Sequence, residues 1–429
     1  MKAVILTAGK GIRLKPITSP IPKPMIPIAG KPLLEHNLLG LKKAGIKEIL
    51  LIVGYKEEII KEYFGDGIDK FGIKISYITQ KKYLGTANAA SYARDFVKND
   101  IFLMMYGDII VDSIIFNNII SEYSEKRPEG LISLLEVENP YNYGVISLDK
   151  NGFVKKITEK PSPDLNLGNL ANIGIYIFNS LIFKAIDNTG LSIRNEYELT
   201  DSMNILINKF GGKITGYISK NLYWNDIGLP WQLLDANKYL LDNLNRDIRG
   251  NIEENVNIKG FVYIDEGTIV KSGSYIEGPC YIGKNNLIGP NAFIRPYTSI
   301  QNNCHIGISE VKNSVIFSNT NIPHFNYIGD SIICNNVNLG AGTNIANLRL
   351  DNKNIKVRIK NNNIDSNKRK LGAIIGSNVK TGINVSIMCG KKIGMNSQIG
   401  ANTLVNDDVP PFTLYYQDPN KGIKSKNLK

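Results

Sequence analysis

The sequence predicts a Rossmann-like α/β domain with a mostly parallel sheet, followed by a left-handed parallel β-helix of hexapeptide repeats. Two periodicities predict this. In the first half, short apolar runs alternate with segments of helical spacing, and after residue 250 an apolar residue recurs at every sixth position. At 429 residues the chain has room for two to three ordinary domains. We expect the α/β domain at 1–229, a linker helix at 230–249 and the β-helix at 250–429.

Strand–helix alternation is clearest before residue 110. Residues 32–44 place apolar side chains at helical spacing and end before Gly45. Residues 48–54 (EILLIVG) instead contain a continuous apolar run after Glu48, as in a strand buried on both faces. Ligands of such sheets bind at the carboxyl ends of the strands. The other elements expected here are a strand at residues 3–7, helices at 57–64 and 86–97, and strands at 73–78 and 101–106.

The second half repeats with a strict period of six. A triangular solenoid explains this period, because each six-residue side supplies one inward side chain per coil. The period is irregular around residues 311–333 and then returns, with Thr381 as the exception. The apolar residues that keep the period are Ile252, Ile258, Ile264, Val270, Ile276, Ile282, Ile288, Ile294, Ile300 and Ile306, and later Ile375, Ile387, Ile393, Ile399 and Val405.

Composition excludes several classes of protein. The four cysteines show no C-x-x-C spacing, so neither a zinc nor a redox motif is expected. No apolar stretch is long enough to span a membrane and the N-terminus lacks a signal-peptide pattern, which predicts a cytoplasmic protein without membrane contact. The net charge of +12 could indicate nucleic acid or phosphorylated small molecules. The basic residues are spread along the chain without a basic helix, which favours a solvated basic surface and predicts no nucleic-acid partner. A basic tail at 421–429 is expected to be mobile.

A glycine-rich loop follows the first strand directly. In LTAGKGIRLKP, residues 6–16, Gly9 and Gly11 let backbone N–H groups approach a phosphate, and Arg13 adds a guanidinium. A dinucleotide-binding fingerprint would need glycine where this chain has Leu14. By itself the loop therefore predicts a phosphate site of low specificity.

Combined with PKPMIPIAGKP, which carries Lys23, this loop resembles the signature of the sugar-phosphate nucleotidylyltransferases. The resemblance implies attack of a sugar 1-phosphate on the α-phosphorus of a nucleoside triphosphate, with release of pyrophosphate. It continues in the same order through the first half, in Gln80 with LGTA (84–87), YGD (106–108), YGV (143–145), EKP (159–161), NIGIY (172–176) and WNDIG (224–228).

The resemblance implies a role for each of these residues. Both substrates are anions, so charge neutralisation and positioning carry the reaction. Arg13 and Lys23 are the implied catalytic residues, and Asp108 and Asp226 the implied ligands of Mg²⁺, which prefers carboxylate and phosphate oxygens. The implied nucleotide-binding residues are Leu6, Ala8, Gly9, Gly11, Gln80, Gly85 and Thr86, and the implied sugar-phosphate-binding residues are Gly144, Glu159 and Asn172.

Residues 323–356 break the repeat. Their motif His324-x-x-Tyr327-x-Gly-Asp, followed by GAGT (340–343) and Asn347, resembles the acetyltransferase half of bacterial bifunctional enzymes that make UDP-N-acetylglucosamine and of their archaeal counterparts. Acetyl transfer from acetyl-CoA to an amino sugar needs a base, and only histidine has an ordinary pKa near neutrality. His324 is the implied base. The implied sugar-phosphate-binding residues are Arg295, Lys312, Tyr327, Asn338, Lys353 and Lys356.

Three points stay open in this half. Asn347 would either orient the amine or stabilise the oxyanion. The basic insertion at 355–371 would either grip coenzyme A phosphates or form a solvated loop. Of the other histidines, His36 is predicted to be structural and His305 to be solvated. Two residues depart from the bacterial pattern: Leu348 stands where a tyrosine is expected, and Asp226 where an asparagine is expected.

The leading hypothesis is a bifunctional enzyme that acetylates glucosamine or galactosamine 1-phosphate and transfers UMP or dTMP to a sugar 1-phosphate. The alternatives are a single-activity glucose-1-phosphate thymidylyl- or uridylyltransferase with a structural β-helix, and a non-catalytic regulatory subunit. Resemblance to other hexapeptide proteins implies a homotrimer. UTP and dTTP stay undecided, because a pocket discriminates one methyl group by only about 10–200-fold.

Overall fold

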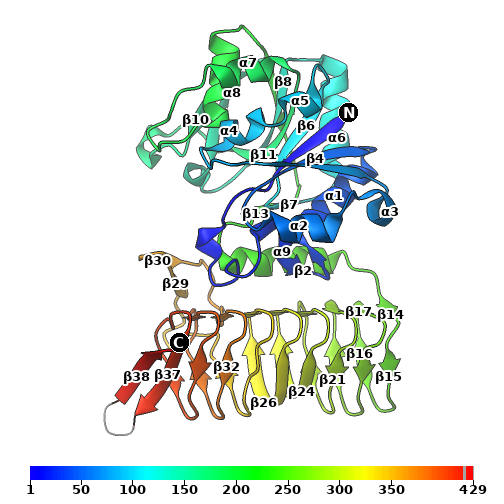
Figure 1. The fold of residues 1–429 in the computed structure, drawn as a ribbon, viewed down its shortest axis with the longest axis vertical. Helices are drawn as coiled ribbons and strands as arrows, with labels where there is room; N and C mark the ends of the chain where they lie inside the picture. The colour runs from blue at the N-terminus through cyan, green and yellow to red at the C-terminus, as the bar shows by residue number, and fades with distance from the viewer. Residues whose placement is uncertain (419–421, 429) are drawn as a thin grey trace. The chain divides into compact units, whose positions relative to one another are not determined.

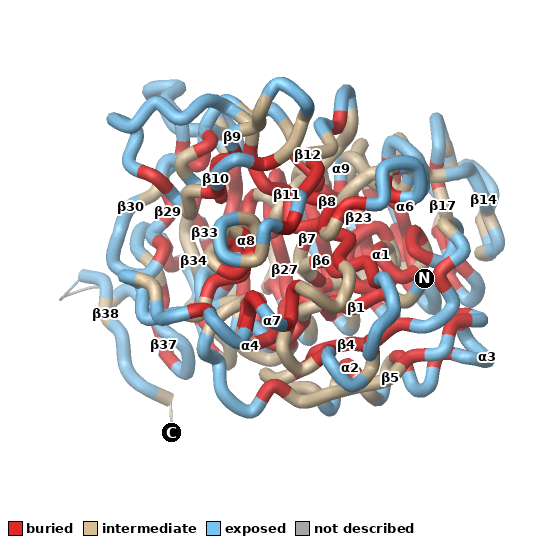
Figure 2. The backbone as a smooth tube through the Cα atoms, turned by 90° about the horizontal axis from the view of Figure 1, so that it is seen from above, coloured by how far each residue is buried: buried red, intermediate tan, exposed pale blue. Residues whose placement is uncertain are grey.

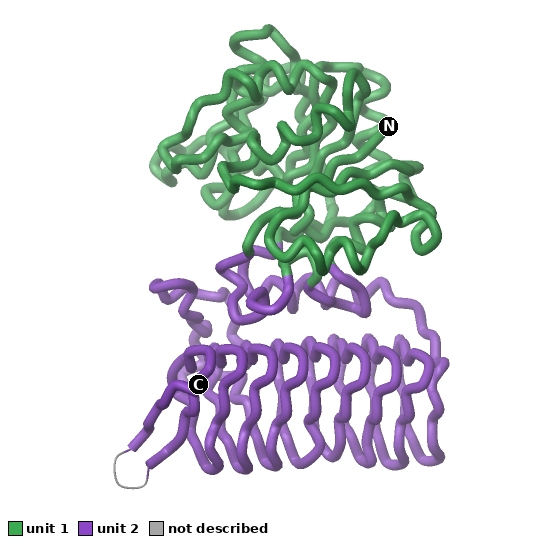
Figure 3. Tube along the Cα trace, viewed as in Figure 1, with its two compact units in different colours: residues 1–10, 22–25, 33–226 green, residues 11–21, 26–32, 227–429 purple. Residues whose placement is uncertain are grey.

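The computed structural model describes residues 1–418 and 422–428, which divide into two compact units (Figure 3). The first unit contains Met1–Lys10, Pro22–Met25 and Leu33–Asp226. The second contains Gly11–Ile21, Ile26–Pro32 and the chain from Ile227 onward. The glycine-rich loop is thus divided between the two units, whereas the sequence predicts that all of residues 1–229 belong to one domain.

The first unit contains a nine-stranded sheet in the order β10-β9-β11-β6-β1-β4-β5, with β8 beside β11 and β12 beside β8. Strands β5, β4, β1 and β6 are mutually parallel, and β11 runs antiparallel to β6. The mostly parallel sheet is therefore confirmed. The strands are β1 (Lys2–Leu6), β4 (Glu48–Val53), β5 (Lys74–Thr79), β6 (Phe102–Tyr106), β8 (Gly130–Glu136), β9 (Gly144–Leu148), β10 (Val154–Glu159), β11 (Leu170–Phe178) and β12 (Ile214–Ile218), with β7 (Ile109–Val111) and β13 (Trp224–Asp226) forming a separate pair.

Helices cover both faces of this sheet (Figure 1). Alternate residues of one strand serve opposite faces, so Ile5 packs in one hydrophobic cluster and Val4 in the other. Strands β1, β4, β6 and β11 are buried almost throughout (Figure 2). One face carries α1 (Leu33–Lys43), α2 (Glu57–Phe64), α3 (Ile68–Phe71) and α6 (Ile114–Lys126), and the other carries α4 (Thr86–Ser91), α5 (Arg94–Val97), α7 (Leu181–Asp187) and α8 (Leu199–Asn208).

The helix expected at 86–97 is divided into α4 and α5. Backbone bonds from Tyr92 to Ala89 and from Ala93 to Ala90 have the tighter three-residue spacing. This tightening ends α4 at Ser91, and α5 begins at Arg94.

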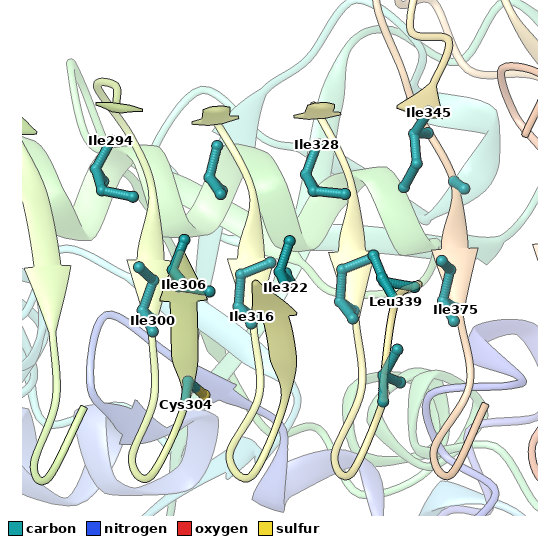
Figure 4. Close-up of a cluster of buried hydrophobic side chains, with 14 of the residues drawn as sticks. Ile294, Ile300, Cys304, Ile306, Ile316, Ile322, Ile328, Leu339, Ile345 and Ile375 are labelled. Carbon is teal, nitrogen blue, oxygen red and sulfur yellow. The ribbon is translucent and has the colours of Figure 1, made fainter. Parts of the chain in front are cut away.

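The second unit contains helix α9 (Pro230–Asp242) and a parallel β-helix. Matching positions lie in register on successive coils, as Ile264, Ile282 and Ile300 do, and they belong to one continuous core. Figure 4 shows part of this core, with Ile300, Ile316 and Ile375 among its side chains. The β-helix strands are β14 (Asp247–Ile248), β15 (Asn251–Ile252), β16 (Asn257–Lys259), β17 (Val262–Ile264), β18 (Ile269–Val270), β19 (Tyr275–Glu277), β20 (Cys280–Ile282), β21 (Leu287–Ile288), β22 (Phe293–Ile294), β23 (Ser299–Ile300), β24 (His305–Lys312), β25 (Val315–Ile316), β26 (Asn321–Gly329), β27 (Ile332–Ile333), β28 (Asn344–Ile345), β31 (Ile374–Ile375), β32 (Lys380–Thr381), β33 (Ser386–Ile387), β34 (Lys392–Ile393), β35 (Gln398–Ile399) and β36 (Leu404–Val405).

The irregular spacing around residues 311–333 reflects shorter coils. Ile300 pairs in register with Ile316, and Ile316 with Ile333, so each step is shorter than three full six-residue sides. These side chains are still fully buried. Thr381 also faces inward, where its hydroxyl lies 2.8 Å from that of Thr343 and accepts a hydrogen bond from the Gly340 N–H.

The coil corners use left-handed backbone, mostly at asparagines such as Asn285 and Asn319. Asparagine tolerates this conformation because its side chain hydrogen-bonds locally. Three corners carry aromatic residues instead, Tyr297, Phe325 and Phe412.

Asn237 of α9 joins three segments of the second unit. Its buried amide oxygen accepts hydrogen bonds from the Ala29 N–H (3.1 Å) and the Ser299 hydroxyl (2.6 Å), and its nitrogen donates to the Tyr297 carbonyl (2.9 Å). Ala29 lies in the turn between the short strands β2 (Pro27–Ile28) and β3 (Lys31–Pro32). Helix α9 is thus bound to a turn from the N-terminal part of the chain and to the β-helix.

Two hairpins extend the β-helix. The insertion forms β29 (Lys356–Ile359) and β30 (Asn362–Asp365), and the chain ends in β37 (Thr413–Asp418) and β38 (Gly422–Asn427). The expectation of a mobile tail is wrong for Gly422–Asn427, because these residues pair with β37, while residues 421 and 429 lie outside the described residues. Within the described residues, no helix is long and apolar enough to cross a membrane.

Candidate active sites

The glycine-rich loop leaves the carboxyl end of β1 and is anchored to the neighbouring strand ends. The Thr7 N–H donates to the Ile52 carbonyl (2.8 Å), and the Ala8 carbonyl accepts from the Tyr55 N–H (3.2 Å). The Leu6 carbonyl accepts from the Gly107 N–H (2.9 Å). A Cβ atom built at Gly9 would meet nothing within 4 Å. The backbone at Gly9 therefore faces open space, as a phosphate-binding position requires.

The part of the loop that carries Arg13 belongs to the second unit. Gly11 has a left-handed backbone (φ 59°) and precedes the short helix η1 (Ile12–Leu14), and its carbonyl accepts from the Thr18 hydroxyl (2.8 Å). The Arg13 guanidinium lies beside Gly228, where a Cβ atom would stand 3.1 Å from Nη2. Glycine at 228 thus leaves room for this guanidinium, which explains one position of the WNDIG motif.

The residues expected to bind the base lie between β5 and α4. The buried Gln80 side chain donates to the Asn88 side chain (3.0 Å), which fixes the orientation of its amide. Gly85 has φ 111°, and a Cβ atom there would lie 2.5 Å from the Tyr197 carbonyl oxygen. The Thr86 hydroxyl accepts from the Leu199 N–H (2.9 Å). Thr86 therefore connects α4 to α8.

The two expected metal ligands lie at one end of the β7–β13 pair. Asp226 is in register with Ile109, which directly follows Asp108. The Lys23 ammonium, almost completely buried, lies 2.5 Å from Asp108 Oδ2, and the Tyr143 hydroxyl lies 3.4 Å from Asp226 Oδ1. Within the described residues no three His, Cys, Asp or Glu side chains could hold a metal together. Two neighbouring carboxylates fit Mg²⁺ that takes its other ligands from phosphate and water.

Gly144, Glu159 and Asn172 come together as expected. Gly144 is in register with Glu159, and a Cβ atom at Gly144 would lie 3.1 Å from Glu159 Oε2 and 3.6 Å from the Asn172 Cβ. The Asn172 amide donates to the Tyr176 hydroxyl (2.7 Å), which donates to the Tyr106 hydroxyl (3.2 Å). Gly144, Glu159 and Asn172 therefore lie together on the neighbouring strands β9, β10 and β11.

The sequence did not indicate Arg194, which lies beside Glu159. Its Nη2 is 3.6 Å from Glu159 Oε1, and its Nε donates to Glu198 (2.8 Å). Burial raises the pKa of Glu159, and the charges of Arg194 and Lys160 oppose this shift. Arg194 lies in a segment without helical or strand periodicity, so only the spatial contact reveals it.

In the second unit, Tyr327, Asn347 and Lys312 form one polar cluster around Asp330. The Asn347 amide nitrogen donates to the Tyr327 hydroxyl (3.2 Å) and to Asp330 Oδ2 (2.5 Å). The Lys312 ammonium lies 3.8 Å from the same carboxylate oxygen. Arg295 pairs with Glu310 (2.7 Å), which is in register with Tyr327. Consecutive coils therefore stack these side chains on one face.

His324 lies exposed on β26, just before the corner at Phe325. The corner separates His324 from Tyr327, because Phe325 has a left-handed backbone (φ 52°). His305 is half-buried, and burial together with the charges of His324 and Lys271 lowers its pKa. The sequence predicts an outward, solvated His305, and in the structure this side chain is partly exposed.

Asn338, Lys353 and Lys356 lie on exposed positions outside this hydrogen-bonded cluster, as far as the described part of the chain shows. Lys353 donates its backbone N–H to Asp351 (3.2 Å), and Lys356 opens β29. The insertion is not a fully solvated loop, because Ile355, Val357 and Ile359 are buried in alternation.

Comparison with known protein families first gives the class of the chain. Residues 2–243 match the family described as nucleotidyl transferase, and residues 276–389 match the GMPPB C-terminal domain. Two solved structures resemble the first half. A UDP-glucose pyrophosphorylase complexed with UDP-glucose covers 56% of this chain and 98% of its own (TM-score 0.52, 25% identity). A putative glucose-1-phosphate thymidylyltransferase from Bacillus anthracis covers 58% and 97% (TM-score 0.51, 32% identity).

Relatives that span both halves define the family. The Bifunctional protein GlmU of Methanocaldococcus jannaschii is 47% identical over 97% of this chain and 98% of its own. The Bifunctional sugar-1-phosphate nucleotidylyltransferase/acetyltransferase of Sulfurisphaera tokodaii is 46% identical over 95% and 98%. The chain belongs to this family of bifunctional enzymes, which confirms the resemblance found in both halves. The Low-salt glycan biosynthesis nucleotidyltransferase Agl11 of Haloferax volcanii is 36% identical over 80% and 94%.

Proposed function

We propose that this enzyme acetylates an amino-sugar 1-phosphate with acetyl-CoA and then transfers UMP or dTMP from the nucleoside triphosphate to the acetylated product. The polar cluster of Tyr327, Asn347, Asp330 and Lys312 carries this proposal. A solenoid with only a structural role needs no such cluster on its surface, because its stability comes from its continuous apolar core. The cluster therefore favours two activities over a single nucleotidyl transfer.

Nucleotidyl transfer uses the residues at the carboxyl ends of the first sheet. Asp108 and Asp226 would hold Mg²⁺, which neutralises phosphate charge when it is bound. Lys23, which pairs with Asp108, would neutralise phosphate oxygens, and Arg13 would hold the triphosphate. Gly9 brings backbone N–H groups to the phosphates, while Glu159 and Asn172 accept and donate hydrogen bonds to the sugar.

Acetyl transfer uses the face of the solenoid. His324 takes a proton from the ammonium group, and the amine nitrogen attacks the thioester carbonyl carbon. As the carbon–sulfur bond breaks, the nitrogen loses a second proton to become the amide, and the departing thiolate of coenzyme A takes up that proton. Lys312, Tyr327 and Arg295 supply positive charge and hydrogen-bond donors for the sugar phosphate. Asn338, Lys353 and Lys356 belong to the same proposal as further phosphate contacts.

The proposal includes an assembly and a location. Solenoid faces commonly associate in threes, so we propose a homotrimer with a mass near three times 47.7 kDa. Because nucleoside triphosphates and acetyl-CoA are made inside the cell, we propose the cytoplasm as its location.

The test measures free thiol during incubation with acetyl-CoA and either glucosamine or galactosamine 1-phosphate. Wild type should release thiol, and His324→Ala should lose about 10²–10⁴-fold of the rate, the usual contribution of a general base. His36→Gln is the matched control, because it replaces a histidine in helix α1 of the first unit, far from His324 in the sequence. Equal thiol release from wild type and His324→Ala would overturn the assignment of the base. No release from wild type with either sugar would leave only the nucleotidyl transfer.

A further inference from the structure

Asp330 is a buried carboxylate at a corner of the solenoid. Its side chain is 6% exposed and its backbone is left-handed (φ 50°). Oδ1 accepts from the Asn313 amide (2.6 Å), and Oδ2 accepts from the Asn347 amide (2.5 Å). Its backbone N–H donates to the Lys312 carbonyl (2.9 Å), and its carbonyl accepts from the Gly372 N–H (2.8 Å). Neighbouring coils therefore fix both its main chain and its carboxylate.

This carboxylate determines how the Asn347 amide is turned. An ionised carboxylate only accepts hydrogen bonds, so the amide nitrogen of Asn347 must face Asp330. The opposite orientation would place the amide oxygen against a carboxylate oxygen. The second N–H of the same nitrogen points at the Tyr327 hydroxyl (3.2 Å). Both N–H bonds of Asn347 are thus directed at protein groups, and its oxygen lies on the other side of the amide.

We infer that Asp330 is a positioning residue for acetyl transfer, which turns the Asn347 amide so that its oxygen accepts a hydrogen bond from the substrate amine. The inference rests on the proposed acetyl transfer. Of the two roles open for Asn347, it selects orientation of the amine, because an oxyanion would need an N–H donor. The hydrogen bond to Asn347 restricts rotation about the carbon–nitrogen bond, so the amine nitrogen is held in one orientation for its attack on the thioester carbon.

The same arrangement affects Tyr327. Its hydroxyl oxygen accepts from Asn347, so its own hydrogen is directed elsewhere and can reach a phosphate oxygen. Burial raises the pKa of Tyr327, and the nearby charge of Asp330 acts in the same direction, so the phenol keeps its proton at neutral pH. Asp330 therefore organises two groups that face the substrate.

An exchange of the two side chains tests the inference. Asn347→Asp places two carboxylates at hydrogen-bond distance and should lower the acetyl-transfer kcat by about 100-fold. Asp330→Asn keeps an acceptor oxygen for Asn347, so its acetyl-transfer kcat should stay within about 10-fold of wild type. Asp330→Ala removes the acceptor, so its kcat should fall by more than about 10-fold. The double variant Asp330→Asn/Asn347→Asp restores the bond with reversed polarity and retains an acceptor toward the amine. It should regain at least about 10-fold over Asn347→Asp.

Nucleotidyl transfer by the same chain and the melting temperature report whether each variant is folded. Asn313→Ala, which removes the hydrogen bond to Oδ1 and leaves the contacts of Oδ2 with Asn347 and Lys312, is the matched control, and its kcat should stay within about 3-fold of wild type. A folded double variant as inactive as Asn347→Asp would overturn this inference alone and indicate that Asn347 acts as a donor. Absence of thiol release from wild type would overturn the proposed acetyl transfer itself.

Discussion

The two candidate sites are assembled in different ways. In the first unit, Lys23, Asp108 and Asp226 are distant in sequence and meet at the ends of strands and short strand pairs. In the second unit, Lys312, Tyr327 and Asn347 come from consecutive coils that stack in register. A parallel sheet brings loops to one edge, but the conformation of each loop determines which side chains come into contact. A solenoid sets those contacts through its repeat, so a residue one coil away is already a neighbour.

The largest expected effect separates the two sites. Asp108→Ala should lower the release of pyrophosphate from UTP or dTTP by about 10³-fold or more, because the metal and Lys23 both lose a carboxylate. Acetyl transfer by the same protein should stay unchanged. Asp112→Ala, a carboxylate just beyond the other end of β7, is the matched control and should stay near wild type. Retained pyrophosphate release in Asp108→Ala would show that the metal site lies elsewhere.

A second change tests the dependence of the first site on loop conformation. Gly85→Ala should destabilise the first unit by about 1–3 kcal/mol, because alanine disfavours φ 111° and its Cβ would press on the Tyr197 carbonyl. We expect weaker binding of the triphosphate and a lower melting temperature by calorimetry. Gly152→Ala, which also has positive φ but open space around it, separates backbone strain from the clash. Equal losses in both variants would assign the whole effect to the backbone.

The acidity of Glu159 gives a smaller effect. Burial raises its pKa, so the carboxylate takes up its proton at a higher pH than an ordinary glutamate and loses its capacity to accept from a sugar hydroxyl. The KM for the sugar phosphate should therefore rise as pH falls toward this raised pKa, and Arg194→Ala should move the rise to still higher pH. The phosphate of the substrate also titrates in this range. Dividing the KM of wild type by the KM of Glu159→Gln at each pH removes that contribution and leaves the effect of the Glu159 carboxylate. A ratio independent of pH would contradict the assignment.

The smallest expected effect concerns a corner of the solenoid beside His324. Phe325 is 69% exposed and has a left-handed backbone, where most other corners use asparagine. Phe325→Asn should therefore stabilise the protein by about 1 kcal/mol, measured as a higher midpoint of urea unfolding. Asn319→Ala, at an ordinary corner with φ 61°, should do the opposite. Loss of stability in Phe325→Asn would mean that the phenyl ring packs against something in the assembled protein.

The difference between the sheet and the solenoid also explains which parts of the fold and of the candidate sites could be predicted from the sequence. The period of six identified the inward residues from Ile264 to Ile306, because each coil repeats one geometry. Family motifs named Asp108, Asp226, Tyr327 and Asn347, and the structure places each pair close together. Arg194 was missed because its segment has no periodicity. The function of Asp330 depends on the direction of two hydrogen bonds, which no spacing in the sequence records.

Asn237 has a consequence for protein engineering. Chimeras of two-domain enzymes can be made by fusing the solenoid of one enzyme to the α/β domain of another at the connecting helix. Here that helix holds the Ala29 turn as well as the coil at Tyr297 and Ser299. A graft that begins at Ile227 would omit the turn and leave a buried acceptor without one of its donors, at a cost of about 1–3 kcal/mol. The transplantable part of this chain is therefore discontinuous and has to include residues 26–32.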